Sequence, residues 1–312
     1  MPDRSPALGF GLPVSGSWAG PTTLRDVAER AEALGYASLW TFQRVLSPVG
    51  APWGEAYRSV LDPVVSLAHV AAVTRRARLG VAVLNAPYTP AALLAKQLAT
   101  LDVVSDGRLD VGLGLGWAHE EFVALGVPEE RRVTRLAETV RCLTALWAPD
   151  PVRFDGQLVT VPPSEVLPKP VQRPRPPVLL GGTAEAALRR AGRIADGWIS
   201  ASRHDLRRVG EAVSTVGAAA QDAGRDAAAL RYVVRGVVHL GEERRSRDGD
   251  RRPLTGGAEA IRDDLGRLGE QGVTEVFLDL NFHPAVGSPD ADPGASRDHA
   301  EEVLETFAPG LS

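Results

Sequence analysis

Short apolar runs alternate with amphipathic stretches along this chain. Eight runs have the length and composition of buried strands, at residues 7–12, 37–42, 77–84, 108–117, 176–182, 196–201, 231–240 and 274–280. Apolar residues recur at helical spacing in the stretches between and after them, at residues 24–34, 64–73, 91–104, 131–147, 183–193, 204–223, 256–271 and 296–307. Strands joined by helices pair in parallel, because each crossover returns the chain to the same end of the sheet. The pattern therefore predicts a (β/α)8 TIM barrel with its functional site at the carboxyl ends of the strands.

Three of the predicted helices carry start signals. Thr23 with Asp26 three residues later resembles a capping box, whereas Asp62 and Thr89 each precede a proline. A doubly wound open sheet is the alternative fold, and it normally carries a phosphate-binding glycine motif after its first strand. Residues 9–20, GFGLPVSGSWAG, match that motif poorly, because Pro13 interrupts it and a long loop precedes the helix.

Two segments interrupt the alternation of strands and helices. Residues 148–177 are dense in proline and predict a small hairpin, inserted between the fourth and fifth units. Residues 241–257 form a charged, glycine-containing loop after the seventh strand, which we expect to be mobile. Long loops in compact folds are often lids or binding loops rather than domains. We therefore expect one domain over residues 1–312 with two insertion segments.

Composition and charge argue against several classes of protein. The 312 residues are 44% hydrophobic and carry a net charge of −4, which gives no electrostatic support for nucleic-acid binding. No apolar run approaches the ~18 residues of a membrane span, and the first residues lack a targeting pattern. Cys142 is the only cysteine and lies at an apolar helical position, so we expect a buried structural thiol. These features predict a cytoplasmic protein.

The histidines show no recognisable metal-ligand spacing, so we expect no metal site. His69 and His239 fall within regular elements and are expected to be structural. His119 differs, because it lies with two glutamates in the loop after the fourth strand. It is a candidate general acid there, and the alternative is that this HEE cluster is the solvated first turn of a helix.

The fourth strand, RLDVGLGLGW, carries glycine at positions 112, 114 and 116. Each glycine weakens a strand, so glycine in this position usually means that a ligand or another backbone comes close. A ligand at the barrel mouth and tight packing inside the narrow barrel are the two explanations that the sequence leaves open.

The organisation resembles the luciferase-like superfamily of flavin- and deazaflavin-dependent oxidoreductases, from about residue 8 to about residue 205. Four segments in register carry the resemblance, namely AEALGYASLW (31–40), VTRRARLG through LGLGW (73–117), LPKPVQRPRPPVLLGG (167–182) and AGRIADGW (191–198). The resemblance implies that the fourth strand presents its backbone to a cofactor ring at Gly114 and Gly116, with Trp117 beside them. It also implies a non-proline cis peptide at a bulge of the third strand, between Ala82 and Val83.

Two further cofactor contacts are implied by the resemblance. Gly181, Gly182 and Thr183 correspond to the region that holds the cofactor phosphate, and a helix that starts there favours an anion. A plain strand-to-helix turn capped by the threonine would look much the same. Asn85 would either bond a cofactor edge or shape the turn after the third strand.

The chain departs from the family pattern after the second strand. Many deazaflavin members carry an acidic residue and a catalytic histidine there, whereas this chain has Gln43 and Arg44 after Phe42. Gln43 can still donate a hydrogen bond, and Arg44 would either hold an anionic substrate or be structural. With His119, these two residues complete our set of candidate catalytic residues.

The identity of the cofactor depends on one position. Flavin-phosphate (FMN) members often place an arginine between the last two glycines of the fourth strand, and this chain has Leu115. The sequence therefore favours coenzyme F420 and hydride transfer to or from a small organic molecule. The alternatives are an FMN-dependent monooxygenase supplied by a partner flavin reductase, and a barrel that binds a ligand without turnover. The resemblance also implies a homodimer, and the loops at 43–61, 148–177 and 241–257 permit an aromatic or an anionic substrate.

Overall fold

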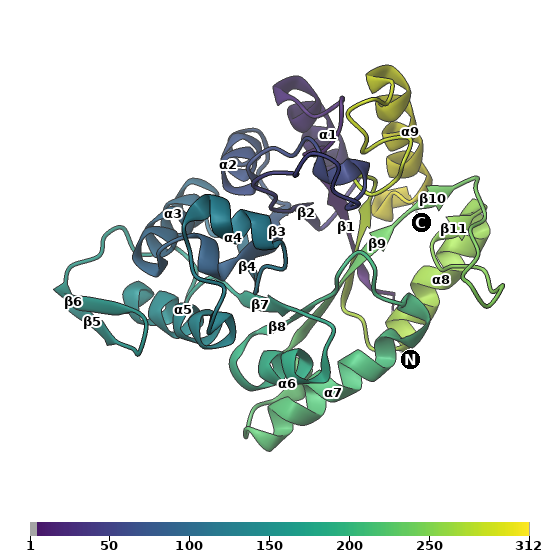
Figure 1. Ribbon diagram of the computed structural model, residues 1–312. Coiled ribbons are helices and arrows are strands. Elements are labelled where there is room, and N and C mark those ends of the chain that lie inside the picture. The colour runs from purple at the N-terminus through teal and green to yellow at the C-terminus, as the bar shows by residue number, and fades with distance from the viewer. Residues whose placement is uncertain (1–4, 312) are drawn as a thin grey trace.

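The computed structural model describes residues 5–311 and contains a closed barrel of parallel strands (Figure 1), which confirms the predicted fold. Residues 1–4 and 312, with which the predicted domain begins and ends, lie outside the described part. Around the barrel the strands follow the order β1-β12-β9-β8-β7-β4-β3-β2. Their bounds are β1 Ala7–Gly11, β2 Ser38–Thr41, β3 Arg78–Asn85, β4 Leu109–Gly114, β7 Val178–Gly181, β8 Gly197–Ile199, β9 Arg231–Val237 and β12 Glu275–Asp279.

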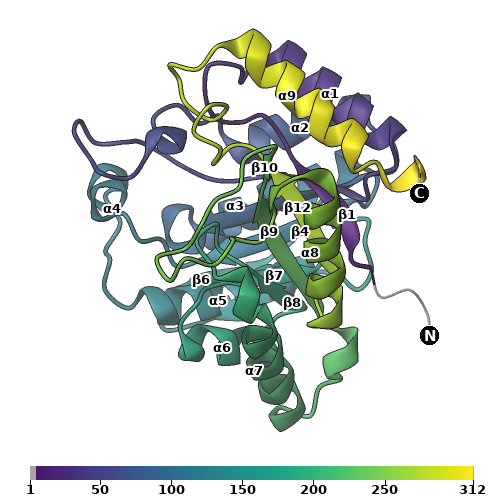
Figure 2. The same cartoon turned by 90° about the vertical axis from the view of Figure 1, so that its right-hand side faces the viewer.

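Helices surround the barrel, and Figure 2 shows the first and last of the main helices side by side. The main helices are α1 Pro21–Ala33, α2 Pro63–Val73, α3 Ala91–Val104, α5 Arg132–Trp147, α6 Glu185–Ile194, α7 Val209–Asp222, α8 Ala258–Glu270 and α9 Pro293–Thr306. A short additional helix, α4 His119–Leu125, follows β4. Single 3-10 turns are η1 Glu55–Tyr57, η2 Ala86–Tyr88, η3 Leu206–Arg208, η4 Ala227–Ala229 and η5 Pro309–Leu311. None of the described helices is long and apolar enough to cross a membrane.

Of the three predicted helix caps, one is present in the structure and two are not. Asp62 caps α2 as expected, because its carboxylate accepts the backbone N–H groups of the second and third helical residues. The capping box at Thr23 is wrong, since α1 begins two residues earlier, at Pro21, and has no side-chain cap. Thr89 likewise forms no cap, because Pro90 occupies that position. The apolar periodicity located the helices, but it did not fix their first residues.

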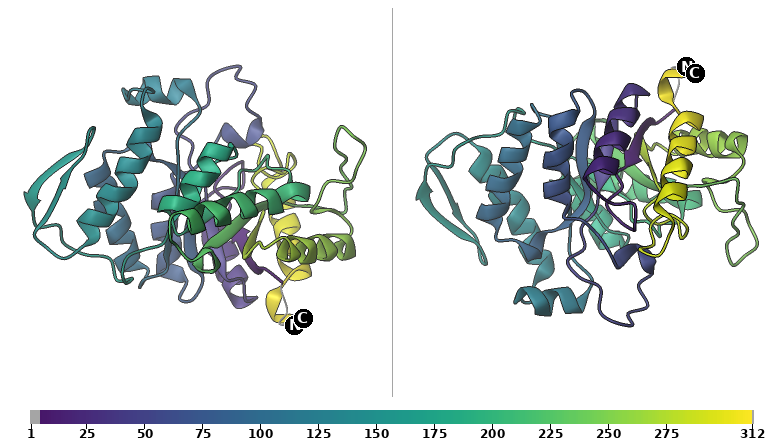
Figure 3. Two further views of the ribbon diagram at one scale, coloured as in Figure 1. Left: turned by 90° about the horizontal axis from the view of Figure 1, so that it is seen from below. Right: turned by 90° about the horizontal axis from the view of Figure 1, so that it is seen from above.

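The two insertion segments extend from different sides of the barrel (Figure 3). The expected hairpin is present as β5 Val152–Asp155 and β6 Thr160–Ser164, and its turn is held by buried Glu138, which accepts three backbone N–H groups. The predicted seventh strand is too long, because β9 ends at Val237. The chain then turns into β10 His239–Leu240, which pairs with β11 Thr255–Gly256 across the charged loop.

The amino-terminal end of the barrel is closed by paired charges. Asp110 is fully buried and accepts from Arg78 and Arg231, each at 2.6 Å. Glu275 accepts from Arg231 at 2.7 Å and from the indole of Trp40 at 2.8 Å. Every one of these side chains comes from the first few residues of its strand. Because this end is filled by compensated ion pairs, the opposite end is the place for a ligand.

Candidate functional site

The third strand bulges at the carboxyl end of the barrel. The register between β3 and β4 shifts between Val81 and Leu84, and the Ala82–Val83 peptide bond is cis. The structure therefore confirms both the bulge and the cis bond that the family resemblance implied. Val83 packs against a buried layer of the barrel interior that includes Trp40 and Phe277.

Arg235 of β9 reaches this bulge from across the barrel. The strand order places β9 opposite β3, four strands away in either direction. The Nη2 atom of Arg235 donates a hydrogen bond to the carbonyl oxygen of Ala82. Only 5% of the arginine side chain is exposed. Its guanidinium lies 4.9 to 5.4 Å from the ring centroids of three aromatic residues, Phe42, Phe277 and Phe282.

The charge of Arg235 is only partly compensated. Its Nη1 lies 3.4 Å from the carboxylate of Asp279, and among the described residues its Nε has no hydrogen-bond partner. Burial lowers the pKa of Arg235, and Asp279 opposes that shift. Asp279 is shared with Asn281, whose backbone and side-chain N–H groups donate to it at 2.9 and 2.8 Å. The sequence signal for this site was an arginine in the middle of the predicted strand 231–240, with apolar residues on both sides, and our prediction missed it.

The glycines of β4 accommodate the bulge. A Cβ on Gly112 would lie 2.0 Å from the carbonyl oxygen of Val81, and one on Gly114 would lie 2.6 Å from a methyl group of Val83. Gly116 has a φ of +74°, and a Cβ there would meet the ring of Phe122 at 2.9 Å and the hydroxyl of Tyr88 at 3.0 Å. The bulged third strand thus leaves no room for a side chain at Gly112 or Gly114, and Phe122 and Tyr88 leave none at Gly116. Contact of a cofactor ring with Gly114, Gly116 and Trp117 stays a prediction.

The residues at the ends of β2 and β7 lie at the same mouth. Gln43 accepts the backbone N–H of Asn85 at 2.8 Å, which ties the end of β2 to the end of β3. At β7, the indole of Trp198 donates to the carbonyl of Gly182 at 2.8 Å. Helix α6 begins at Glu185 after Ala184 and has no side-chain cap, so Thr183 is not the capping residue. The roles of Gln43, Asn85 and residues 181–183 toward a cofactor stay predictions.

Arg44 forms a buried ion pair. Its Nη2 lies 2.6 Å from Glu121 Oε2, and the two side chains are 3% and 0% exposed. Glu121 also accepts the backbone N–H of Val45 at 2.6 Å and the hydroxyl of Tyr88 at 2.8 Å. The guanidinium of Arg44 lies 4.7 to 5.2 Å from the centroids of three aromatic rings, those of Trp53, Tyr57 and Trp117. The structure thus favours the structural alternative for Arg44, and a solvated position for Glu121 is wrong.

His119 lies at the surface. Its side chain is 73% exposed, and its Nδ1 is 3.0 Å from Glu129, whose hydrogen bond raises the pKa of the histidine. It opens helix α4 with Glu120, which is also exposed. The solvated helical turn is therefore the correct alternative for these two residues, and a catalytic role for His119 stays without structural support.

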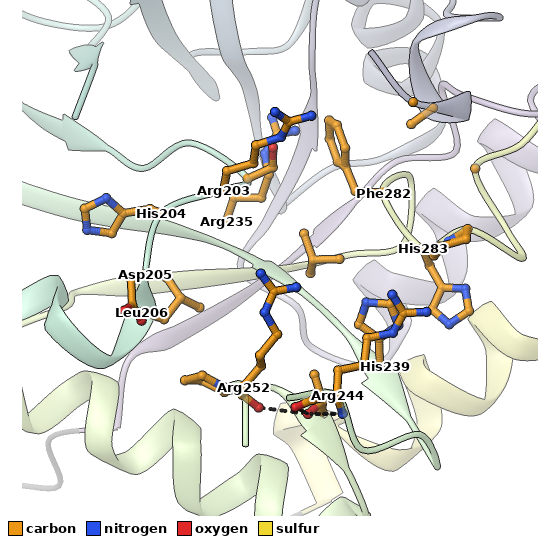
Figure 4. A pocket seen from close by; sticks show the side chains of 18 of the residues that line it. Arg203, His204, Asp205, Leu206, Arg235, His239, Arg244, Arg252, Phe282 and His283 are labelled. Carbon is orange, nitrogen blue, oxygen red and sulfur yellow. Dashed lines mark hydrogen bonds between the residues drawn. The ribbon is translucent and has the colours of Figure 1, made fainter. Parts of the chain in front are cut away.

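A cavity of about 700 Å³ opens at the carboxyl ends of β8, β9 and β12. It is lined by residues from four stretches, within 53–57, 202–207, 235–255 and 282–288 (Figure 4). None of the site residues that we predicted lines it. Three of its lining residues do contact them, since Arg235 bonds the carbonyl of Ala82 while Trp53 and Tyr57 cover Arg44. Four chain segments far apart in sequence form this cavity, so no local motif marked it.

Two histidines meet at the cavity wall. The rings of His239 and His283 have centroids 4.5 Å apart, and Glu242 lies 3.6 Å from Nδ1 of His239. Burial is the main reason why the pKa of each ring is lowered to about 4. A second histidine adds to each shift, namely His283 for His239 and His299 for His283. One ligand atom each from His239, Glu242 and His283 lie within 4.8 Å of one another, as in a metal-binding set. The sequence analysis predicted neither this cluster nor the position of His239 at a cavity, because His283 lies in another part of the chain.

Comparison with known proteins gives the same fold and related sequences. A family model described as luciferase-like monooxygenase matches residues 8–298. An uncharacterized protein of Mycobacterium tuberculosis is 36% identical over 260 residues, which cover 83% of this chain and 79% of that protein. Two solved structures superpose with a TM-score of 0.77, a monooxygenase from Streptomyces bottropensis at 22% identity and an F420-dependent secondary alcohol dehydrogenase at 17%. They cover 98% and 97% of this chain and 99% of their own, and they show the fold alone.

Two relatives with named activities use different cofactors. An F420-dependent glucose-6-phosphate dehydrogenase of Microbacterium testaceum is 34% identical over 203 residues, 64% of this chain and 58% of that protein. An FMNH2-dependent dimethylsulfone monooxygenase of Pseudomonas putida is 33% identical over 175 residues, 55% of this chain and 46% of that protein. These comparisons indicate a flavin or deazaflavin cofactor without distinguishing between the two.

Proposed function

Because the chain belongs to the luciferase-like monooxygenase family, whose members are oxidoreductases, we propose that it transfers hydride between coenzyme F420 and a small organic substrate. The observation that carries the proposal is the bulge of β3 between Val81 and Leu84, with Arg235 fixed on the carbonyl of Ala82 beside a cavity. The choice of F420 over FMN depends on Leu115, which stands where flavin members often carry a phosphate-binding arginine.

The residues around the cavity suit a flat aromatic ring. The volume of about 700 Å³ lies within the ~300 to 1,000 Å³ that is usual for small-molecule sites. Tyr57 and Phe282 supply aromatic walls, and the unpartnered Nε of Arg235 supplies a buried donor. These residues and the bulge would hold the ring, while residues 181–183 would hold its phosphate. The bound coenzyme supplies the hydride donor or acceptor, and the protein supplies orientation and electrostatics.

The chain itself supplies positioning and hydrogen-bond acceptors. Arg235 fixes the carbonyl of Ala82, and Gln43 fixes the backbone of Asn85, so the bulge is held from two directions. His239 and His283 are neutral at physiological pH, because burial lowers the pKa of each to about 4. In this state either ring can accept a hydrogen bond from the hydroxyl group of an alcohol substrate.

An FMN-dependent monooxygenase is the second candidate, favoured by the 33% identity to the dimethylsulfone monooxygenase. A partner reductase would then supply reduced flavin. The two candidates differ in the fate of the reduced cofactor, since a reduced flavin activates oxygen and a reduced deazaflavin passes hydride to an organic substrate.

Titration of the purified protein with oxidised F420 and with FMN, followed by fluorescence, separates the candidates. We expect F420 to bind at least tenfold more tightly than FMN. The reverse order, together with oxygen uptake in the presence of reduced FMN, would replace the first candidate by the second. Binding of neither would contradict both and support a barrel without turnover. Light scattering on the same sample tests the homodimer that we expect from the family.

A further inference from the structure

The cavity carries a charge opposite to that of the protein. The chain as a whole has a net charge of −4. The residues that line the cavity nevertheless include five arginines and only two carboxylates, namely Arg203, Arg207, Arg235, Arg244 and Arg252 against Glu55 and Asp205. A concave surface of one sign raises the local concentration of ligands of the opposite sign. The lining therefore points to an anionic ligand.

Two of these arginines are already neutralised by neighbouring carboxylates. Arg207 pairs with Asp205, Asp248 and Asp250 at 2.8 to 3.0 Å, and Arg244 lies 3.2 Å from Glu242. Their charges hold the surrounding loops together. Arg207 and Arg244 therefore do not need an external anion to balance their charges.

The remaining three arginines lack full compensation. Arg203 and Arg252 line the cavity as exposed residues, and within residues 5–311 neither takes part in an ion pair. Arg235 has one carboxylate at 3.4 Å and a buried Nε without a hydrogen-bond partner among the described residues. Figure 4 shows the three side chains projecting into one space from the loop after β8, from β9 and from the charged loop. An anion in this space can accept charge-assisted hydrogen bonds from guanidinium groups that have no carboxylate partner.

We propose that Arg203 and Arg252 bind a phosphate or carboxylate group of the substrate, so that the proposed oxidoreductase acts on an anionic organic molecule. This assignment of the substrate class rests on the proposed function. The group bound here is distinct from the cofactor phosphate, because residues 181–183, where we expect that phosphate, are not among the residues that line the cavity. Arg235 joins the anion site to the bulge at Ala82 and thus to the expected position of the ring.

Calorimetric titration of the full-length protein at low salt with pyrophosphate and with citrate tests the anion site. We expect both probes to bind with dissociation constants below millimolar, and Arg203→Gln and Arg252→Gln each to weaken binding at least tenfold. Arg245→Gln is the matched control, because Arg245 is exposed on the same charged loop, pairs with Glu243 and does not line the cavity. Its affinity should stay within twofold of the wild type. Equal affinity in all four proteins, or an equal loss in all three variants, would overturn the anion site.

A second titration identifies the source of the anionic group. The protein is first saturated with whichever of F420 and FMN it binds, and pyrophosphate is then added. Unchanged pyrophosphate affinity supports a substrate site, whereas displacement would show that these arginines hold the cofactor's own phosphate and would overturn the substrate assignment. If neither cofactor binds and the arginine variants still weaken pyrophosphate binding, the proposed function fails and the anion site stands. If F420 binds and the variants leave anion binding unchanged, the proposed function stands and the substrate class fails.

Discussion

Replacing Glu121 by glutamine tests how much the buried ion pair with Arg44 stabilises the folded protein. Glu121 is fully buried and is the only carboxylate paired with Arg44 within the described residues. The Nε and Nη1 atoms of Arg44 have no hydrogen-bond partner there, so the charge of the guanidinium depends on this one contact and on the surrounding rings. Glutamine keeps the shape of the side chain and removes its charge.

The expected loss of stability arises from the desolvation of the remaining cation. Removing one partner of a buried ion pair costs about 3 to 5 kcal/mol, because the other charge is left uncompensated. The amide of glutamine can still accept one of the N–H groups at 2.6 Å, but its NH2 group then faces a donor. We therefore expect Glu121→Gln to lower the free energy of unfolding by about 3 kcal/mol.

Urea unfolding of four proteins measures the interaction directly. The set is the wild type, Glu121→Gln, Arg44→Met and the double variant. Because the double variant leaves neither charge buried, its loss should be smaller than the sum of the single losses by about 2 kcal/mol. Asp26→Asn serves as the control, since Asp26 and Arg25 form an exposed pair, and it should change stability by less than ~0.5 kcal/mol. Losses that add within ~0.5 kcal/mol would refute a coupled buried pair.

Three further predictions concern β4, the histidine pair and the bulge. Gly112→Ala should destabilise the protein by about 2 kcal/mol, because the new Cβ would lie 2.0 Å from a backbone carbonyl oxygen. Gly266→Ala on α8 is the control and should not destabilise the protein, because open space surrounds that position. Equal urea midpoints for the two variants would contradict this prediction. His239 and His283 have folded pKa values of about 4, below the ordinary 6.5, so stability is full above pH 6.5 and falls toward pH 4, by up to about 3 kcal/mol for one ring. Replacing both by asparagine should flatten thermal stability against pH, and parallel profiles for the two proteins would argue against the buried neutral pair. Arg235→Met removes the donor to the bulge and should weaken coenzyme binding at least tenfold; an unchanged affinity with an unchanged melting temperature would contradict its positioning role.

The fold was predictable because the apolar pattern that indicates it is spread over the whole chain. Eight strands and their helices each contribute several apolar positions, and an error at one helix start, such as Thr23, leaves the barrel unchanged. Cys142 illustrates the same point, since its apolar helical position predicted a residue that the structure buries completely and whose pKa burial raises to about 11. The cis bond at Ala82–Val83 came from the family resemblance, because no local pattern of residues marks it.

The site was harder to predict, because its chemistry depends on contacts between distant segments. Glu121 lies beside two exposed residues in the HEE cluster, and only its contact with Arg44, 77 positions away, shows that it is buried. His239 and His283 likewise meet only after β9 and β12 have entered the barrel. Periodicity reports which face of an element is buried, but it does not report which partner lies against that face.

Arginine illustrates how the two ends of one barrel use the same residue type differently. At the amino-terminal end, Arg231 lies between the carboxylates of Asp110 and Glu275 at 2.6 and 2.7 Å, so its charge is satisfied within the chain and serves stability. At the carboxyl end, Arg252 has no carboxylate partner among the described residues and lines a cavity. Arg235 stands between these cases, with one distant carboxylate and one free donor. Arg231 and Arg252 therefore differ in their compensation by carboxylates, and Arg252 is the one of the two that we propose to bind an anion.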